Sequence, residues 1–193
     1  TASGVGDLLG KYTALADWKI TNILDGEYIC DRICEMEYDA LDKLKESLDG
    51  LSNRDINAYE ELMYGLLLSG LAMQMTGHSR PASGAEHHMA HFWEMAVIND
   101  EIDAYHGEKV GVGLIQVSDI YHEAVKYLKE GNFKVKDHVD IETDLIEKTF
   151  TNKELCESIK KTNDPNLLDL IDPKVLREKT EEIIRIIEEI PKA

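Results

Sequence analysis

Apolar residues recur at the three- to four-residue spacing of an α-helix along most of this 193-residue chain. The spacing predicts helices over residues 6–24, 55–75 and 107–130, one or two helices over 27–48, and amphipathic helices over 137–150, 152–161 and 172–190. A histidine-rich helix is predicted to begin near residue 84. No stretch has the alternating pattern of a convincing strand. The sequence therefore predicts an all-α bundle of about seven to nine helices.

Local features refine this expectation. Asp55 is a plausible N-cap for the helix that follows it, and residues 49–53 are predicted to form a loop. Residues 62–73 are apolar on nearly every side, which is typical of a buried helix. Gly111 and Gly113 weaken a helix intrinsically, so we expect them to let its backbone pass close to another helix or to a site.

The composition restricts the possible partners. With 21 basic and 38 acidic residues the net charge is −17, which disfavours binding to nucleic acid or to an anionic membrane. Three cysteines do not form an even disulfide framework and predict free thiols in a reducing cytoplasm. We see neither a signal peptide nor an apolar run of transmembrane length, and expect a cytoplasmic protein.

Residues 1–193 are expected to form one helical domain, with the functional site in residues 1–130 and peripheral amphipathic helices in residues 131–193. The chain opens at Thr1, without methionine, directly into a glycine-rich motif. We therefore expect a further domain to precede it.

A cluster of histidines between residues 80 and 110 is the strongest functional signal. His87 and His91 are four residues apart and share one face of a helix, and His106 follows where the next helix begins. Histidines in helices are commonly surface or core residues without a functional role. Here they lie amid apolar sequence, where imidazoles need partners, and they are natural ligands for zinc, nickel or iron. Asp7 is the best candidate for a third ligand, although its place in a first helical turn also suits capping.

The loop before the histidine helix has the composition of an anion receptor. Arg80 supplies a guanidinium, and the helix that follows Ser83 offers free backbone amides to a phosphate group. A simple structural loop with a capping serine is the alternative interpretation.

Three motifs, GVGDLLGKYTALADW, GHSRPASGAEHHMAHFWEM and HGEKVGVG, together resemble the glycerol-1-phosphate dehydrogenases, the bacterial branch above all. These enzymes share a superfamily with glycerol dehydrogenases, iron-type alcohol dehydrogenases and dehydroquinate synthases. The resemblance is strong up to about residue 114 and weak beyond. It implies that this chain is the C-terminal helical domain of a two-domain enzyme whose N-terminal nucleotide-binding domain, which binds NAD or NADP, is not part of this chain.

The resemblance also implies roles for single residues. Asp7, His87 and His106 match the metal ligands, and His88 is the rival of His87. His91 matches a substrate-contacting histidine that orients the substrate or relays its proton, and Asp7 also contacts substrate. The metal would be zinc or nickel, or else iron.

The expected reaction interconverts dihydroxyacetone phosphate and sn-glycerol 1-phosphate by metal-assisted hydride transfer, in phospholipid metabolism. Arg80 would hold the phosphate of this three-carbon substrate. We expect the isolated chain to be inactive and the complete enzyme to be a homo-oligomer, in the simplest case a homodimer. A glycerol or other polyol dehydrogenase domain, and a non-enzymatic acidic helical module for metal binding or interaction, are the alternatives.

Overall fold

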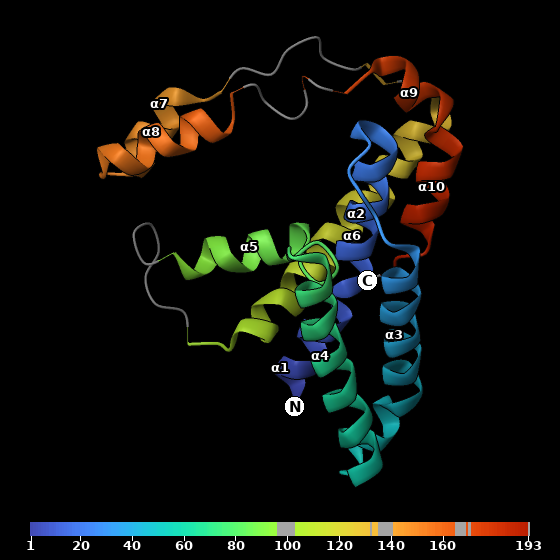
Figure 1. The fold of residues 1–193 in the computed structure, drawn as a ribbon. Coiled ribbons are helices and arrows are strands. Elements are labelled where there is room, and N and C mark those ends of the chain that lie inside the picture. Colours follow the sequence, from blue (N-terminus) through green and yellow to red (C-terminus); the bar gives the residue numbers. More distant parts are fainter. Residues whose placement is uncertain (96–102, 132, 135–140, 165–168, 170, 193) are drawn as a thin grey trace.

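The computed structural model describes residues 1–95, 103–131, 133–134, 141–164, 169 and 171–192. Every regular element in these ranges is helical (Figure 1), which confirms the all-α prediction. The helices are α1 (Ala2–Leu9), α2 (Lys11–Asp25), α3 (Asp31–Ser52), α4 (Ile56–Thr76), α5 (Ala85–Glu94), α6 (His106–Glu130), α7 (Thr143–Thr149), α8 (Lys153–Thr162), α9 (Pro173–Glu178) and α10 (Thr180–Glu188). Only Gly10 separates α1 from α2, and only Lys179 separates α9 from α10, so these pairs resemble bent helices.

Helices α3 and α4 form a long antiparallel hairpin (Figure 1). The loop expected over residues 49–53 is shorter than predicted, because α3 continues to Ser52. Gly50 lies inside α3, where a Cβ atom would come within 2.8 Å of the Ala58 side chain, so glycine here permits close packing on α4. The predicted cap of α4 is confirmed, since the Asp55 carboxylate accepts the Asn57 N–H at 3.0 Å.

One face of α4 is exposed, and the expectation that residues 62–73 are buried all round was wrong. The buried face is narrow and consists of Ala58, Leu62, Gly65, Ser69 and Ala72. The other face leaves several large apolar side chains more than half exposed, namely Ile56, Met63, Tyr64, Leu67, Leu71 and Met75. The cause is that α4 packs against α3 and α1 only along its buried side.

Glycines bring the backbones of α1, α5 and α6 into direct contact. A Cβ atom on Gly107 would lie 1.9 Å from the Ser3 carbonyl oxygen, and one on Gly6 would lie 2.2 Å from the Gly107 oxygen. A Cβ atom on Gly113 would lie 2.6 Å from the Glu86 oxygen. These distances are far below ordinary contact, so α6 crosses both neighbours as closely as its backbone allows. The close approach expected for the glycines of this helix is confirmed at Gly113.

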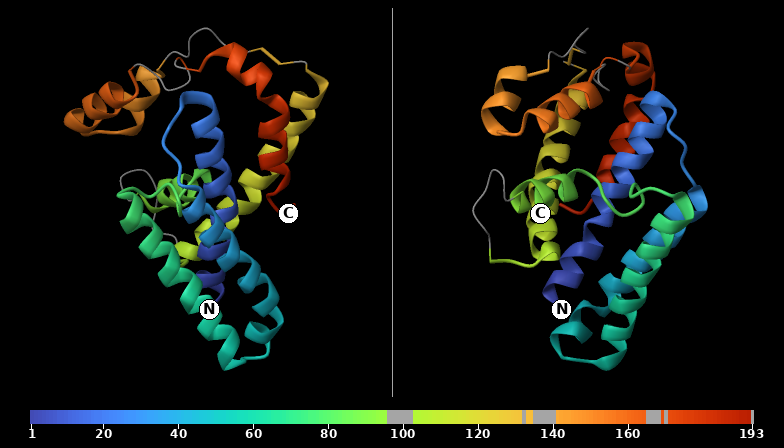
Figure 2. Two further views of the ribbon diagram at one scale, coloured as in Figure 1. Left: turned by 45° about the vertical axis from the view of Figure 1, so that its right-hand side comes forward. Right: turned by 60° about the vertical axis from the view of Figure 1, so that its left-hand side comes forward.

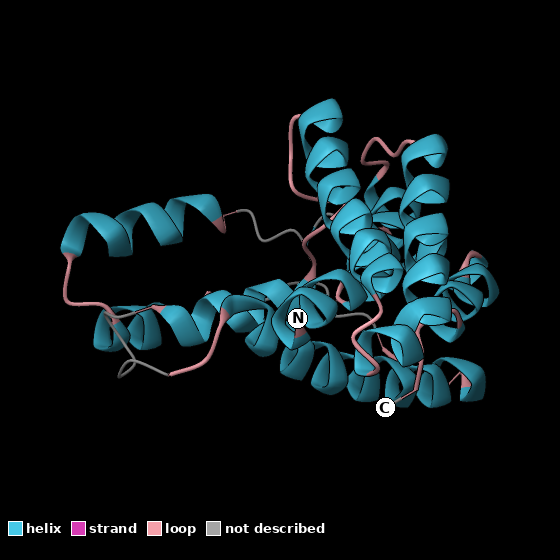
Figure 3. Cartoon of the chain, turned by 90° about the horizontal axis from the view of Figure 1, so that it is seen from below, coloured by secondary structure: helices cyan, strands magenta, loops and turns pink. Residues whose placement is uncertain are grey.

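The C-terminal region divides into two parts. Helix α10 packs on α2 and α6, and Ile183, Ile186 and Ile187 are buried there with Ala16 and Val125. The isoleucine stripe of this helix therefore contributes to the core shared by α2 and α6. Helices α7 and α8 pair with each other, and Figure 1 and the left view of Figure 2 show them away from the other helices. The view from below (Figure 3) shows that the described residues form helices and loops. The first part of the helix predicted over 137–150 falls outside the described residues.

All three cysteines are free, as predicted. Within the described ranges, no helix combines the length and apolar character needed to cross a membrane.

Candidate metal centre

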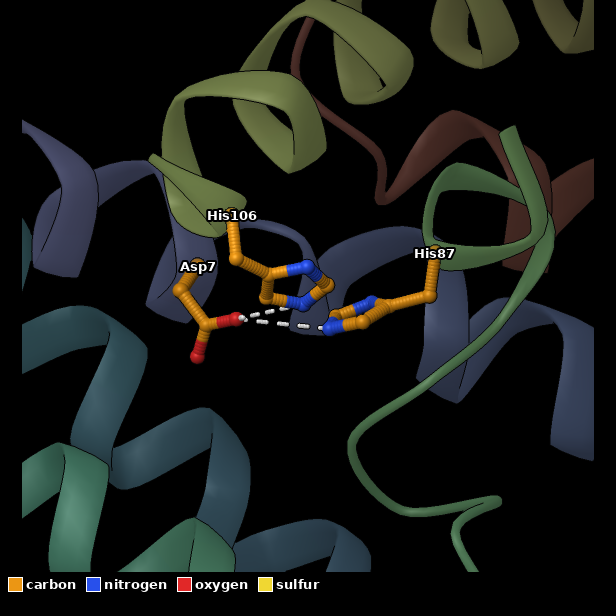
Figure 4. A group of neighbouring side chains, drawn as sticks. All are labelled: Asp7, His87 and His106. Atoms are coloured by element: carbon orange, nitrogen blue, oxygen red, sulfur yellow. Dashed lines mark ion pairs between the residues drawn. The ribbon is translucent and has the colours of Figure 1, made fainter. Parts of the chain in front are cut away.

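Three side chains from separate helices converge on one point (Figure 4). Asp7 comes from α1, His87 from α5 and His106 from the first turn of α6. The Oδ1 atom of Asp7 lies 3.3 Å from His87 Nε2 and 3.8 Å from His106 Nε2. One ligand atom from each residue lies within 4.8 Å of the other two. The structure thus brings together the three residues predicted as metal ligands, with the same ring nitrogen of each histidine facing the same carboxylate oxygen.

The packing of the glycines explains this convergence. Gly6 directly precedes Asp7, and Gly107 directly follows His106, so the close contact between α1 and α6 fixes these two side chains beside each other. Asp7 lies in the second turn of α1, so the alternative role of capping a first turn was wrong, and Thr1 occupies the N-cap position.

A buried carboxylate orients His87 from behind. The Nδ1 atom of His87 lies 2.7 Å from Glu86 Oε1, and Glu86 is fully buried. Glu86 also accepts the Thr13 hydroxyl at 2.5 Å and the Gly84 N–H at 2.9 Å. Burial alone would raise the pKa of Glu86, but its hydrogen bonds with His87, Thr13 and Gly84 lower it. An ionised Glu86 therefore holds the proton of His87 on Nδ1 and leaves Nε2 facing Asp7.

Another carboxylate orients His106 in the same way. The Nδ1 atom of His106 lies 3.1 Å from Glu94 Oε1 and 3.2 Å from Glu94 Oε2. Lys109, one turn further along α6, lies 3.4 Å from the same Oε1 atom. Slight burial would raise the pKa of Glu94, but the hydrogen bond and the charge of His106 lower it. Both histidines therefore carry a carboxylate on Nδ1, which is the usual support of a metal-bound imidazole.

The charges around Asp7 favour its ionised form. Lys11, whose side chain is almost fully buried, places Nζ 3.3 Å from Asp7 Oδ2. Burial would raise the pKa of Asp7, yet the hydrogen bond with His87 and the charge of Lys11 lower it to about 2. Burial would lower the pKa of His87, but its hydrogen bonds with Asp7 and Glu86 raise it. The cluster thus attracts positive charge at the point where the three ligand atoms meet.

His91 lies at the exposed edge of this cluster, whereas His88 lies outside it. The His91 ring stacks on His106 with centroids 5.1 Å apart and lies 6.1 Å from the His87 ring. His88 is exposed and is absent from both groups of potential metal ligands among the described residues. The geometry therefore favours His87 over its rival His88.

The donors predicted to receive a phosphate are held by the chain's own carboxylates. Arg80 donates from Nε to Glu27 Oε1 at 2.9 Å, and its NH2 lies 2.8 Å from Glu27 Oε2. At the start of α5 the Ala85 N–H donates to Asp17 at 2.7 Å, and Gly84 caps the helix in place of Ser83. A phosphate at this loop would have to displace these carboxylates.

Sequence reasoning missed three glutamates. Glu86 adjoins His87, and Glu94 follows His91 by three residues, so the i, i+3 spacing was a signal for the second. Glu37 in α3 is fully buried, and neither of its carboxylate oxygens has a hydrogen-bond partner in the described part of the chain. Burial raises the pKa of Glu37 to about 7, against the opposing charge of Lys11. Nothing in the local sequence distinguishes Glu37 from the other acids of α3.

Comparison with known proteins gives several relatives that share one name. A protein from Bacillus licheniformis named glycerol-1-phosphate dehydrogenase (NAD(P)+) is 43% identical over 125 residues, which is 64% of this chain and 31% of that protein. Proteins of the same name from Sulfolobus acidocaldarius and Pyrococcus furiosus are 39% and 31% identical, over 62% and 69% of this chain and 33% and 38% of their own lengths. No family model matches the chain.

The chain spans about a third of the length of these curated relatives. The resemblance predicted from the three motifs is confirmed, and it concerns a part of proteins that are NAD(P)-dependent dehydrogenases by name.

Proposed function

We propose that this chain is the metal- and substrate-binding part of a glycerol-1-phosphate dehydrogenase. The complete enzyme would interconvert dihydroxyacetone phosphate and sn-glycerol 1-phosphate with NAD or NADP. The observation that carries the proposal is the convergence of Asp7, His87 and His106, which occupy the matching positions of the three motifs. The similarity to dehydrogenases of that name supports it.

The donor set fits a divalent metal ion. One carboxylate oxygen and two imidazole nitrogens suit zinc, nickel or iron and leave coordination positions for a substrate. The ligand atoms lie close enough together to share one ion, and both imidazoles are already oriented by carboxylates on their far nitrogens. Such an ion would supply Lewis-acid polarisation of a carbonyl or hydroxyl group.

The remaining roles belong to side chains at the rim of the cluster. His91 is exposed and stacks on His106, so it can orient a substrate hydroxyl and exchange its proton with water. The Oδ2 atom of Asp7 pairs with Lys11 Nζ, and this ion pair keeps the carboxylate in place while Oδ1 faces the histidines. Arg80 would bind the substrate phosphate after exchanging Glu27 for it.

The nicotinamide cofactor would be bound by a separate nucleotide-binding domain of the complete enzyme. Hydride transfer would take place between that cofactor and a substrate held at this cluster. We propose further that this chain is inactive without that domain and that the complete enzyme is a homo-oligomer in the cytoplasm.

A polyol dehydrogenase is the second candidate, and one observation favours it. Because Glu27 neutralises Arg80, the loop offers no free positive charge to a phosphate. Comparing glycerol with glycerol 1-phosphate as substrates of the complete enzyme would discriminate between the two. A clear preference for glycerol would reject the phosphorylated substrate.

Metal content of the purified chain is the first test. We expect about one zinc, nickel or iron ion per chain by mass spectrometry, and strong loss in the His87→Ala and Asp7→Asn variants. His88→Ala is the matched control, because it removes an exposed imidazole from the same helix. Equal metal content in all of these variants would reject the metal centre, and retained folding would be verified by circular dichroism.

A further inference from the structure

Glu94 does more than contact His106, because it also faces His91. The Oε2 atom of Glu94 lies 3.3 Å from His91 Nδ1 and 3.2 Å from His106 Nδ1. One ligand atom each of His91, Glu94 and His106 lies within 4.8 Å of the other two. Two imidazoles and one carboxylate therefore meet here as well, on the more exposed side of the His106 ring.

The two clusters have a similar design. In the inner cluster, Asp7 presents one oxygen to two histidines and the other oxygen to Lys11. In the outer cluster, Glu94 presents Oε2 to two histidines, while Oε1 lies 3.1 Å from His106 Nδ1 and 3.4 Å from Lys109 Nζ. The His106 ring lies between them, with Nε2 toward Asp7 and Nδ1 toward Glu94.

We propose that His91, Glu94 and His106 form a second, outer site for a divalent transition-metal ion such as Zn²⁺, and that it competes with the inner site for His106. A neutral imidazole has one free lone pair, so His106 can ligate through Nε2 or through Nδ1 but not through both. The competition, though not the outer site itself, rests on the proposed inner metal centre.

The outer site is the weaker of the two. Its side chains are more exposed than those of the inner cluster, so a bound ion is less shielded from water. Lys109 must share the Glu94 carboxylate with the ion, and its positive charge opposes binding. In the complete enzyme, an excess of zinc would draw His106 toward Glu94 and inhibit the inner site.

Zinc titration of the metal-free chain by calorimetry tests this proposal. In wild type we expect one tight ion and a second weak ion, since the second must bind without His106. In Asp7→Asn the inner site is lost, so His106 can ligate at the outer site. The zinc affinity of the outer site should therefore be roughly tenfold higher, or more, in Asp7→Asn than in wild type. Adding Glu94→Gln to Asp7→Asn should remove this binding. His87→Ala provides a second background without the inner site, in case Asp7→Asn disturbs the fold.

Two results would overturn the proposal. If Glu94→Gln leaves zinc binding unchanged in the Asp7→Asn and His87→Ala backgrounds, the outer site does not exist and Glu94 only orients His106. If the weak ion binds equally well with and without Asp7, the sites do not compete. A different result would show that the inner metal centre does not exist. Wild type and Asp7→Asn would then each bind one zinc ion with the same affinity, and Glu94→Gln would abolish zinc binding in both.

Discussion

Replacing the buried Glu37 by glutamine should stabilise the protein in a strongly pH-dependent manner. The carboxylate is fully buried in α3, and burial raises its pKa from 4.5 to about 7. A carboxyl group whose pKa is higher in the folded state ionises more readily in the unfolded chain. Raising the pH therefore lowers the free energy of unfolding in the range between the two pKa values. The loss of stability therefore begins near pH 4.5 and is complete above about pH 7.

The magnitude follows from the two pKa values. Each pKa unit corresponds to about 1.4 kcal/mol, so the ionisable Glu37 costs the native state about 3 kcal/mol at pH 8 and about 1 kcal/mol at pH 5. Glutamine cannot ionise and avoids this cost. An unpaired buried amide carries its own penalty, but that penalty is the same at both pH values and cancels in their difference.

Urea unfolding of wild type and Glu37→Gln at pH 5 and pH 8 measures the effect. The variant's advantage should grow by about 2 kcal/mol between the two pH values. Glu46→Gln, which changes an exposed glutamate of the same helix, is the matched control and should show no such change. An equal effect of Glu37→Gln at pH 5 and pH 8 would refute the assigned cause, because the side chain would then not titrate differently in the folded state.

Three further predictions concern the site. Gly107→Ala should lower the free energy of unfolding by about 1–3 kcal/mol and weaken zinc binding, because its Cβ would overlap the backbone of Ser3. Gly70→Ala is the control and should be neutral or stabilising in thermal unfolding, because no atom lies within 4 Å of its Cβ. Glu86→Gln should lower zinc affinity roughly 10–100-fold in calorimetry, and an unchanged affinity would show that it does not orient His87. Arg80→Ala in the complete enzyme should raise KM for glycerol 1-phosphate far more than for glycerol, and equal effects on both would remove Arg80 from phosphate binding.

Helix positions and the ligand set could be predicted because each depends on local sequence. Apolar periodicity marks a helix wherever one side is buried, and Asp55 before α4 is a local capping signal that the structure confirms. Asp7, His87 and His106 could be chosen from motifs, and the structure brings them within ligand distance of one another.

The errors concern packing partners, which local sequence does not specify. The exposed face of α4 consists of apolar residues that are typical of a core. Its sequence therefore predicted burial, although the described helices leave this face uncovered. Arg80 has the chemistry of an anion receptor, but Glu27, which neutralises it, lies far away in sequence. Glu37 was missed because a buried acid resembles a surface acid until the fold encloses it.

The glycine contacts between α1 and α6 also bear on how a bound ion would leave. Side-chain rotation alone cannot separate Asp7 from His106 widely, because Gly6 and Gly107 lock their backbones together. Asp7 lies on α1, whereas His87 and His106 lie on α5 and α6, so release of an ion requires α1 to move away from the other two helices. A bound ion would therefore cross-link α1 to the bundle and slow its local opening, which amide hydrogen exchange across Ala2–Leu9 reports directly.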